Sequence, residues 1–307
     1  NVFGAEWKND QRDARMLAKM LELREHLDAE RDKAFLVIEK SSLINEKLKI
    51  LSRHQQTLID EKVRLQNRLR KKLLEVSPEI LELGDVDSKK LLRVLNKYPD
   101  IKKYKQLSLK SLMTVEMIGK KRAASMLDGL RNIRIVEELA DIYKTIILSY
   151  SRRLLELKKE IKDIDNDLEA LGKDSREVKR LRSISGVGVK LSSRLTGEIG
   201  DINRFNNESQ LAVYCGVACV DDDSGKKKST RSVYKANTIC KATMIEIAGC
   251  TIRYNSESMT YYAKKRAEGK KHNHALRCLA RQLIKVIFRI LKEDRDYIVK
   301  EEMKKAA

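Results

Sequence analysis

The feature that most restricts the fold is an apolar periodicity that runs from Ile135 to Leu171. Apolar side chains recur there every three or four residues, with a run of four-residue steps in the middle, at Ile135, Leu139, Ile142, Ile146, Tyr150, Leu154, Leu157, Ile161, Ile164, Leu168 and Leu171. This spacing predicts one long helix with a coiled-coil face. The helix buries that face either against an earlier helix of the chain, in an antiparallel hairpin, or against another chain.

The flanking sequence predicts how this helix is connected. From Met16 to Val76, leucines at helical spacing alternate with charged residues, which predicts further long helices. Ser77-Pro78 should end them, because a proline and the residue before it continue a helix poorly. Residues 84–132 form a basic insert of shorter helices in which the sequence indicates no chemistry, and Gly172-Lys173-Asp174 is typical of a hinge. We therefore expect an arm over 31–175 and a further domain over 176–307.

Composition supports a mainly α fold and a polyanionic partner. The 307 residues contain two prolines, 36% charged and 5% aromatic residues, which favours helices. The formal net charge of +20 fits binding to nucleic acid. A solvated basic surface without a specific partner is the alternative.

The cysteines and the hydropathy indicate a reducing compartment. Five cysteines are present, and the spacing of Cys215 and Cys219 is not that of a zinc site. We therefore expect buried free thiols. No apolar run approaches the roughly 20 residues that a membrane span needs, so the chain is expected to be cytoplasmic, with no membrane partner.

Two aspartates near the beginning of the chain are candidate metal ligands. Asp10 and Asp13 lie three residues apart and share one face if the segment is helical. Paired carboxylates can hold a divalent cation, although further acidic ligands are needed to complete its shell. Alternatively, Asp10 caps the helix and Asp13 interacts with the helix dipole. The chain starts without methionine, and we expect residues 1–30 to be the end of a domain whose first part is missing.

Two other features predict contacts to phosphates. Ser185-Gly186-Val187-Gly188-Val189 resembles the turn of a helix-hairpin-helix motif, in which glycines let backbone N–H groups approach a phosphate. An ordinary turn between two helices is the alternative. A final helix from Ala275 to Leu291 repeats basic residues every four positions beside an apolar face, at Arg277, Arg281, Lys285 and Arg289.

A serine also lies in a polar loop between Asp221 and Lys228. Ser224 and Gly225 stand there between three aspartates and the run Lys226, Lys227 and Lys228, and chemistry, if the chain has any, is expected in this stretch. A serine in such a loop is otherwise an ordinary turn residue.

The order of these signals is more specific than any one of them. It comprises Lys8-x-Asp10-x-x-Asp13-Ala14, a long helical arm, Ile184-Ser185-Gly186-Val187-Gly188, Glu198-Ile199-Gly200-Asp201 with Arg204-Phe205, Leu211-Ala212-x-Tyr214-x-Gly216, Ser224-Gly225 and Leu279-Ala280-Arg281-Gln282-Leu283. The chain thus resembles, over almost its whole length, the DEDD-type (Piv-like) insertion-sequence transposases that a bridge RNA guides.

The resemblance implies a mechanism and partners. It implies a RuvC-like α/β domain with four metal-binding acids, a coiled-coil arm, and a transposase domain with a nucleophilic serine. That serine forms a covalent phosphoserine with DNA, while bridge RNA pairs with donor and target double-stranded DNA in the cytoplasm or at the nucleoid. The protein is expected to assemble as a dimer to tetramer.

The resemblance also assigns roles to residues. Asp10 and Asp13 match the last two acids and would hold Mg²⁺, and Ser224 matches the nucleophile. DNA or RNA contacts are expected from Gly186, Gly188, Lys226, Lys227, Lys228, Arg231, Lys235, Arg277 and Arg281. The segment Lys235-Ala236-Asn237-Thr238 departs from the usual turn after the serine. The first Asp and the Glu of the acidic set are absent, so we expect this chain alone to cut DNA poorly.

Two rival hypotheses remain from the sequence. One is a truncated relative that binds RNA and DNA without chemistry. The other is a structural coiled-coil protein whose basic faces bind nucleic acid without specificity.

Overall fold

The computed structural model describes residues 10–26, 42–221, 230–232 and 236–298. Its elements are α1 (Asp10–His26), α3 (Leu43–Val76), η1 (Pro78–Leu83), α4 (Lys89–Lys97), η2 (Ile101–Gln106), α5 (Leu109–Met113), α6 (Lys120–Arg131), α7 (Glu137–Asp174), α8 (Arg176–Arg182), α9 (Val189–Ile199), η3 (Ile202–Arg204), α10 (Glu208–Tyr214), β1 (Cys219–Asp221), β2 (Thr230–Ser232), α11 (Thr238–Tyr254), α12 (Ser256–Ala267) and α13 (His272–Lys292). The predicted mainly α fold is confirmed. Within the described ranges, the strands form one antiparallel pair, with Val220 opposite Arg231.

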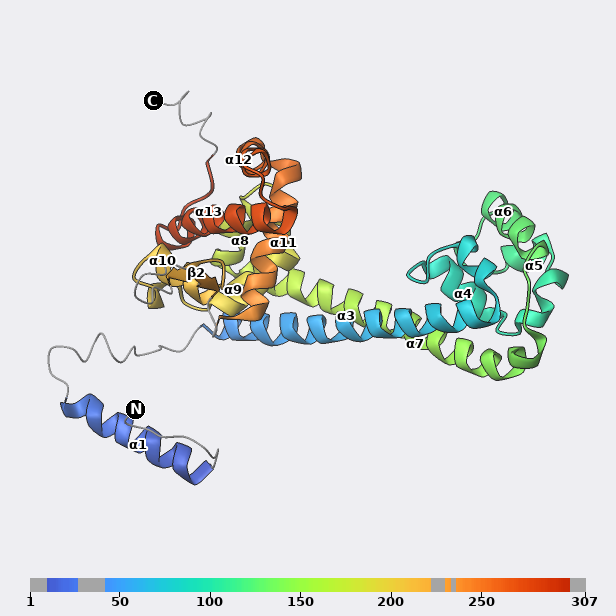
Figure 1. Cartoon of the computed structure of the whole chain (residues 1–307), viewed down its shortest axis with the longest axis horizontal. Helices are drawn as coiled ribbons and strands as arrows, with labels where there is room; N and C mark the ends of the chain where they lie inside the picture. Colours follow the sequence, from blue (N-terminus) through green and yellow to red (C-terminus); the bar gives the residue numbers. More distant parts are fainter. Residues whose placement is uncertain (1–9, 27–41, 222–229, 233–235, 299–307) are drawn as a thin grey trace.

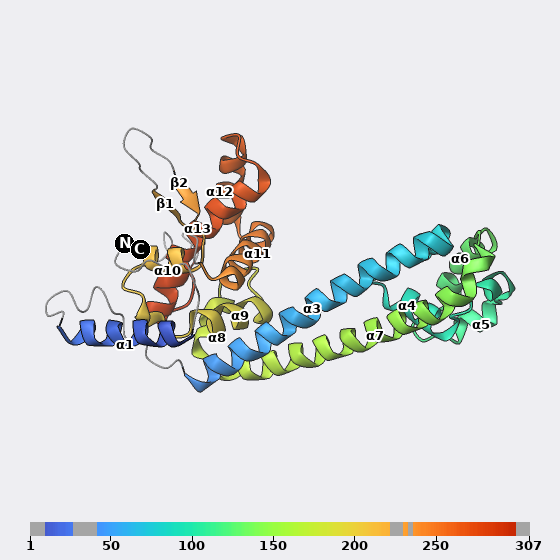
Figure 2. The same ribbon diagram turned by 60° about the horizontal axis from the view of Figure 1, so that its bottom comes forward.

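Helices α3 and α7 form a long arm, in which they lie side by side and antiparallel (Figures 1 and 2). The Ser42 side chain accepts a hydrogen bond from the Asn45 backbone N–H and caps the start of α3. Helix α3 ends at Val76, directly before the Ser77-Pro78 pair, as the sequence predicted. Of the two pairings left open, the structure thus shows the antiparallel hairpin within one chain.

The apolar stripe predicted for α7 is buried in its second half but not in its first. Leu154, Leu157 and Leu168 are buried against α3, whereas Leu139 and Ile142 are exposed. Each four-residue step turns the stripe by about 40° more than a full helical turn, so the run of fours carries it around the helix. The buried face of the first half runs instead through residues such as Ala140 and Ile147.

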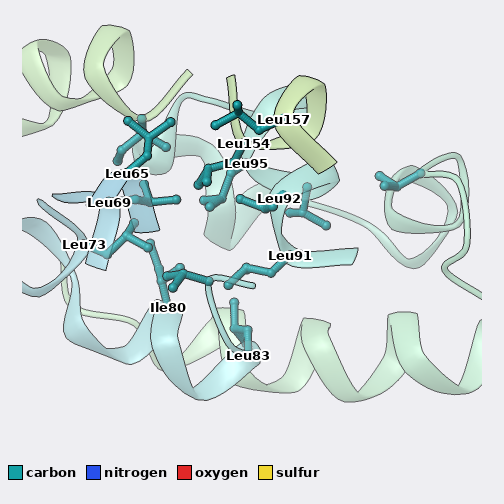
Figure 3. Close-up of a cluster of buried hydrophobic side chains, with 14 of the residues drawn as sticks. Leu65, Leu69, Leu73, Ile80, Leu83, Leu91, Leu92, Leu95, Leu154 and Leu157 are labelled. Carbon is teal, nitrogen blue, oxygen red and sulfur yellow. The ribbon is translucent and has the colours of Figure 1, made fainter. Parts of the chain in front are cut away.

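The basic insert forms a lobe at the far end of the arm, and we call residues 78–134 the distal lobe (Figure 1). Its short helices bury leucines against the last turns of α3 and against Leu154 and Leu157 in the middle of α7 (Figure 3). Leu91, Leu92 and Leu95 of α4 lie in this core together with Leu69 and Leu73 of α3, and all five side chains are fully buried. The distal lobe and the arm therefore share one hydrophobic core.

The other end of the arm packs on a helical domain built from α8 to α13. Helix α9 is buried along its length because α3, α7, α8 and α11 all contact it. At Gly197 the backbones of α9 and α3 meet so closely that a Cβ there would lie 2.5 Å from the backbone nitrogen of Lys49. The fold at this junction therefore requires glycine.

The predicted free thiols are confirmed for four cysteines. Cys215 and Cys240 are buried, and Cys250 and Cys278 are half-buried, all without a disulfide. The Cys215 Sγ lies 3.2 Å from the Cys240 Sγ. This sulfur contact, with burial, raises the pKa of Cys240 well above its ordinary value, so the thiol is unreactive.

Helix α1 carries both N-terminal aspartates at its start, and Leu17 and Leu21 on it are exposed. The assignment of residues 1–30 to a RuvC-like domain, like the other domain boundaries, stays a prediction. No helix in the described ranges has the length and apolar character that crossing a membrane requires.

Candidate active-site anchor and nucleic-acid interface

The centre of the helical domain is a fully buried carboxylate, that of Glu198 near the end of α9. Arg53 on the arm helix α3 binds it through two parallel bonds, with Nε 2.7 Å from Oε1 and Nη2 2.9 Å from Oε2. Two-point pairing of this kind fixes both distance and orientation. One arginine thus joins the arm to the domain.

Asn237 gives the same carboxylate a second partner. Its Nδ2 donates to Glu198 Oε2 at 2.7 Å and lies 3.0 Å from the Tyr214 hydroxyl. Its Oδ1 accepts from the Cys240 backbone N–H and caps α11, while its own N–H donates to the Tyr214 carbonyl. Asn237 therefore ties the start of α11 to the end of α10 and to α9.

Aromatic stacking fixes the end of α10 against the same point. The Arg204 guanidinium lies 4.7 Å from the Phe205 ring centroid and 4.4 Å from that of Tyr214. Arg204 Nη2 and the Tyr214 hydroxyl both donate to the Glu198 carbonyl, at 3.3 and 2.8 Å. The motif residues that the sequence singled out around Glu198, Arg204 and Tyr214 thus converge in space.

The protonation state of Glu198 follows from these partners. Burial alone would raise its pKa, but the hydrogen bonds from Arg53 and Asn237 outweigh that effect and lower the pKa below its ordinary value. The carboxylate is therefore charged at neutral pH.

We call Glu198, Arg53, Asn237 and Tyr214 the Glu198 anchor. Tyr214 precedes the β1–β2 pair in the chain and Asn237 follows it. Glu198 therefore binds residues on both sides of that pair, Tyr214 through its backbone carbonyl and Asn237 through its carboxylate. In the sequence, Ser224 falls between β1 and β2. Ser224, Lys226, Lys227, Lys228 and Lys235 lie outside the described residues, and of Arg231 the structure describes the backbone in β2.

A groove beside the start of β1 contains both predicted arginines. Its walls come from α10, α12, α13 and the residues before β1, and it is lined by Ser209, Val213, Val217, Ala218, Tyr261, Lys265, His274, Arg277, Cys278, Arg281 and Gln282. Arg281 Nη2 donates to Ser209 Oγ at 3.2 Å, and its Nη1 is buried with no hydrogen-bond partner among the residues that the structure describes. Arg277 is exposed one turn away and has no carboxylate partner in the described part of the chain. The groove can therefore accept an anion.

The two predicted glycines lie in the turn between α8 and α9. Gly186 has a φ of +93°, and a Cβ there would lie 3.1 Å from the Cys250 carbonyl oxygen of α11. Gly188 caps α9, is exposed, and has no atom within 4 Å of a Cβ position. The backbone of α9 is thus open to close approach at its N-terminus.

Asp10 and Asp13 both belong to α1, three residues apart, and their side chains lie outside the description. Across the described residues, no group of three or more His, Cys, Asp or Glu side chains is placed to hold a metal ion. The structure does not bring the two aspartates together with Arg277, Arg281 or the α8–α9 turn.

Sequence reasoning missed the anchor itself. Glu198 had a signal, because a carboxylate within the apolar helix that ends at Ile199 needs a buried partner. Arg53 had none, since it is one cation among many on a charged helix.

Comparisons with known proteins agree with this arrangement. Residues 178–263, which include the α8–α9 turn, Glu198 and Asn237, match the model of the transposase IS116/IS110/IS902 family. The chain is 26% identical over 303 residues to a 44.8 kDa protein of insertion element IS116 from Streptomyces clavuligerus, covering 96% of this chain and 73% of that protein. It is 26% identical over 307 residues to a 43.6 kDa protein of insertion element IS110 from Streptomyces coelicolor, covering 97% and 74%. A transposase for insertion sequence element IS1111A from Coxiella burnetii is 24% identical over 158 residues, 50% of this chain and 43% of that protein.

By class, the proteins that this chain is similar to belong to insertion elements, and one of them is a transposase. The family whose model matches part of its helical domain is the transposase IS116/IS110/IS902 family.

Proposed function

We propose that this chain is a transposase that exchanges DNA strands through a covalent phosphoserine at Ser224, guided by a structured bridge RNA. The observation that carries the proposal is the Glu198 anchor, which holds the residues on both sides of the Ser224 segment with a buried, charged network. A nucleophile needs a fixed position relative to the scissile bond. Bonds that hold Tyr214 and Asn237, on the two sides of the Ser224 segment, support a role for that segment as the nucleophile's site.

The proposed chemistry conserves the number of phosphodiester bonds. The Ser224 oxygen forms a bond to phosphorus, one bond from phosphorus to a deoxyribose oxygen breaks, and the serine proton passes to the departing oxygen. A hydroxyl of the new partner strand then attacks the phosphoserine and releases Ser224. Because a serine hydroxyl is a weak nucleophile, it requires an activating base or metal.

Asp10 and Asp13 are the proposed Mg²⁺ ligands of this chain. Two carboxylates three residues apart on a helix suit a hard cation that binds oxygen, and further acids would complete the shell. Bound Mg²⁺ would polarise the phosphate and stabilise the charge of the transition state.

The strands are proposed to lie along the groove and the α8–α9 turn. Arg281 has a buried donor without a partner in the described structure and Arg277 is exposed beside it, so both can bind a phosphate. Gly186 and Gly188 are proposed to contact a phosphate in this turn: Gly188 leaves the backbone at the start of α9 open to close approach, and Gly186 supplies the positive φ of the turn. Lys226, Lys227, Lys228, Arg231 and Lys235 are proposed to hold the strands near Ser224.

Bridge RNA, donor and target double-stranded DNA, and further copies of this chain are the proposed partners, in the cytoplasm. The net charge of +20 supports binding of nucleic acid. The family resemblance supports the guide RNA and a dimer to tetramer.

The test is to trap the adduct with the whole gene product. The protein is incubated with its RNA, Mg²⁺ and donor DNA, quenched under denaturing conditions, and examined for protein bound covalently to DNA. We expect an adduct that Ser224→Ala abolishes and that Ser229→Ala, the matched control in the same segment, retains. Binding of DNA and RNA without any adduct would instead identify an inactive relative that only binds nucleic acid.

A further inference from the structure

The turn between α5 and α6 in the distal lobe repeats the turn between α8 and α9. A shift of 69 residues aligns the apolar positions of the two turns and their capping glycines: Leu112 with Leu181, Val115 with Ile184, Ile118 with Val187, and Gly119 with Gly188. All three apolar pairs are buried, and both glycines are exposed. The two turns thus present the same pattern to core and solvent.

Their backbones follow the same course. In the distal turn the Ile118 N–H donates to the Val115 carbonyl at 3.1 Å, and in the other turn the Val187 N–H donates to the Ile184 carbonyl at 3.0 Å. The residue two before the glycine cap has a positive φ in both, +68° at Met117 and +93° at Gly186.

The glycine caps match as well. Gly119 has φ −83° and ψ 168°, and Gly188 has φ −80° and ψ 173°. Because this agreement covers the whole hairpin, the distal lobe contains a second copy of the helix-hairpin-helix-like turn.

The second copy is open and cationic at its tip. No atom lies within 4 Å of a Cβ position at Gly119, so the backbone there can be approached closely. Lys120 and Lys121 follow directly, both exposed, and in the described part of the chain neither has an ion pair. Lys102 and Lys103 of the same lobe are by contrast paired with Asp141 and Asp100.

The charge of the whole insert points to the same kind of partner. Residues 84–132 contain twelve Lys and Arg against five Asp and Glu. Met117, two residues before the open glycine, keeps a left-handed backbone that a bulky residue adopts only at a cost.

The two turns lie at opposite ends of the arm (Figures 1 and 2). Helix α3 has 34 residues, which corresponds to a separation of about 50 Å. The distal copy also lies outside residues 178–263, which match the family model.

We infer that the distal turn is a second contact for the phosphate backbone of duplex DNA, made by the N–H groups at the start of α6 together with Lys120 and Lys121. That the duplex is DNA rests on the proposed transposase function. Backbone N–H groups and lysine side chains bind phosphates without contacting the bases, so the contact should not depend on the DNA sequence.

The test measures binding, not strand exchange, so its outcome is separate from that of the adduct experiment. The full chain is titrated against a labelled DNA duplex of about 30 base pairs, which spans about 100 Å, over a range of salt concentrations. Lys120→Gln with Lys121→Gln should weaken binding about fivefold to tenfold and reduce the salt slope by about 2. Lys102→Gln with Lys103→Gln removes the same charge from the same lobe and should change the affinity less than twofold.

A second variant separates binding from folding. Gly119→Asp places a favourable capping residue at a position with room for it, so the thermal stability should be equal or higher. Its carboxylate stands where the phosphate would lie, so binding to DNA should weaken. Unchanged DNA affinity in Gly119→Asp, or equal losses in the two lysine pairs, would overturn the inference. A loss confined to structured RNA would also overturn it.

Discussion

Removing Arg53 tests whether the Glu198 anchor joins the arm to the helical domain. In Arg53→Ala, Glu198 keeps its hydrogen bond from Asn237 but loses both bonds from the guanidinium. The carboxylate has no exposed surface while Arg53 covers it, and water that enters the space of the removed side chain replaces a charged, two-point partner only in part. The variant should therefore be destabilised.

The expected magnitude follows from the exposure of the two side chains. Breaking a fully buried pair costs about 3–5 kcal/mol. Here the Glu198 side chain is 0% exposed but that of Arg53 is 48% exposed, so solvent weakens the pair. We expect a loss of about 2 kcal/mol, in the range of a hydrogen-bonded charge, and about half of that for Arg53→Lys, which cannot pair at two points.

The loss should depend on pH in a defined direction. The folded pKa of Glu198 lies below its ordinary value of 4.5, so the anchor stabilises fully above pH 4.5 and loses its effect as the pH falls through the folded pKa. Without Arg53, burial dominates and raises the pKa, so protonation relieves the variant. The difference between the two proteins should thus be greatest at neutral pH, begin to shrink as the pH falls through the raised pKa of the variant, and shrink further below pH 4.5 as the parent protein loses the effect of the anchor.

The assay is thermal unfolding, measured for four proteins: the parent chain, Arg53→Ala, Glu198→Gln and the double variant. A difference of about 2 kcal/mol corresponds to about 5 °C in a chain of this size. In a chain that already carries Glu198→Gln, the further change Arg53→Ala should lower the free energy of unfolding only slightly. If it costs as much there as in the parent chain, the two residues are not coupled and the reasoning is refuted.

Three further predictions test other contacts. Gly197→Ala should lower the free energy of unfolding by about 2–3 kcal/mol, because the added Cβ meets the Lys49 backbone. Gly249→Ala is the control: nothing lies within 4 Å of its Cβ position, so it should stabilise α11 by about 0.5–1 kcal/mol. Equal effects of the two variants in thermal unfolding would contradict the close approach of α3 and α9. Met117→Gly should raise stability by about 0.5 kcal/mol, since relief of the positive φ exceeds the entropy cost of glycine, and a lower melting temperature would disprove strain there. Arg281→Ala should weaken binding to DNA duplexes of every sequence alike and lower the salt slope by about 1, and a loss that depends on the sequence would show base reading instead.

Much of the fold could be predicted because helices leave regular patterns. The end of α3 before Pro78 and the bounds of α11, residues 238–254, follow from local sequence. The prediction of the buried face of α7 was wrong for the first half of the helix, because spacing shows which residues are apolar but not which face meets α3.

The candidate site could be predicted only in part. Arg281 and the turn at Gly186 had recognisable patterns, whereas Arg53 reaches Glu198 from 145 residues away and gave no signal. The distal turn was missed because Met117 stands where the other copy has Gly186, so a search for paired glycines finds one copy. The shared feature is the backbone conformation, which side-chain identity specifies weakly.

Two consecutive residues of α9 connect the arm to the segment that carries Ser224. Gly197 brings α3 into backbone contact with α9, and Glu198 binds Arg53 of α3 and Asn237 of α11 with the same carboxylate. A shift of α3 along α9 would therefore break the Arg53 pair and remove one of the two partners that keep Glu198 charged. The position of the arm and the position of the β1–β2 base are thus not independent. Helix α6 of the distal turn contacts η1, and η1 contacts α3. We therefore expect a DNA contact at the distal turn to be coupled, through α3 and Glu198, to the base of the β1–β2 pair.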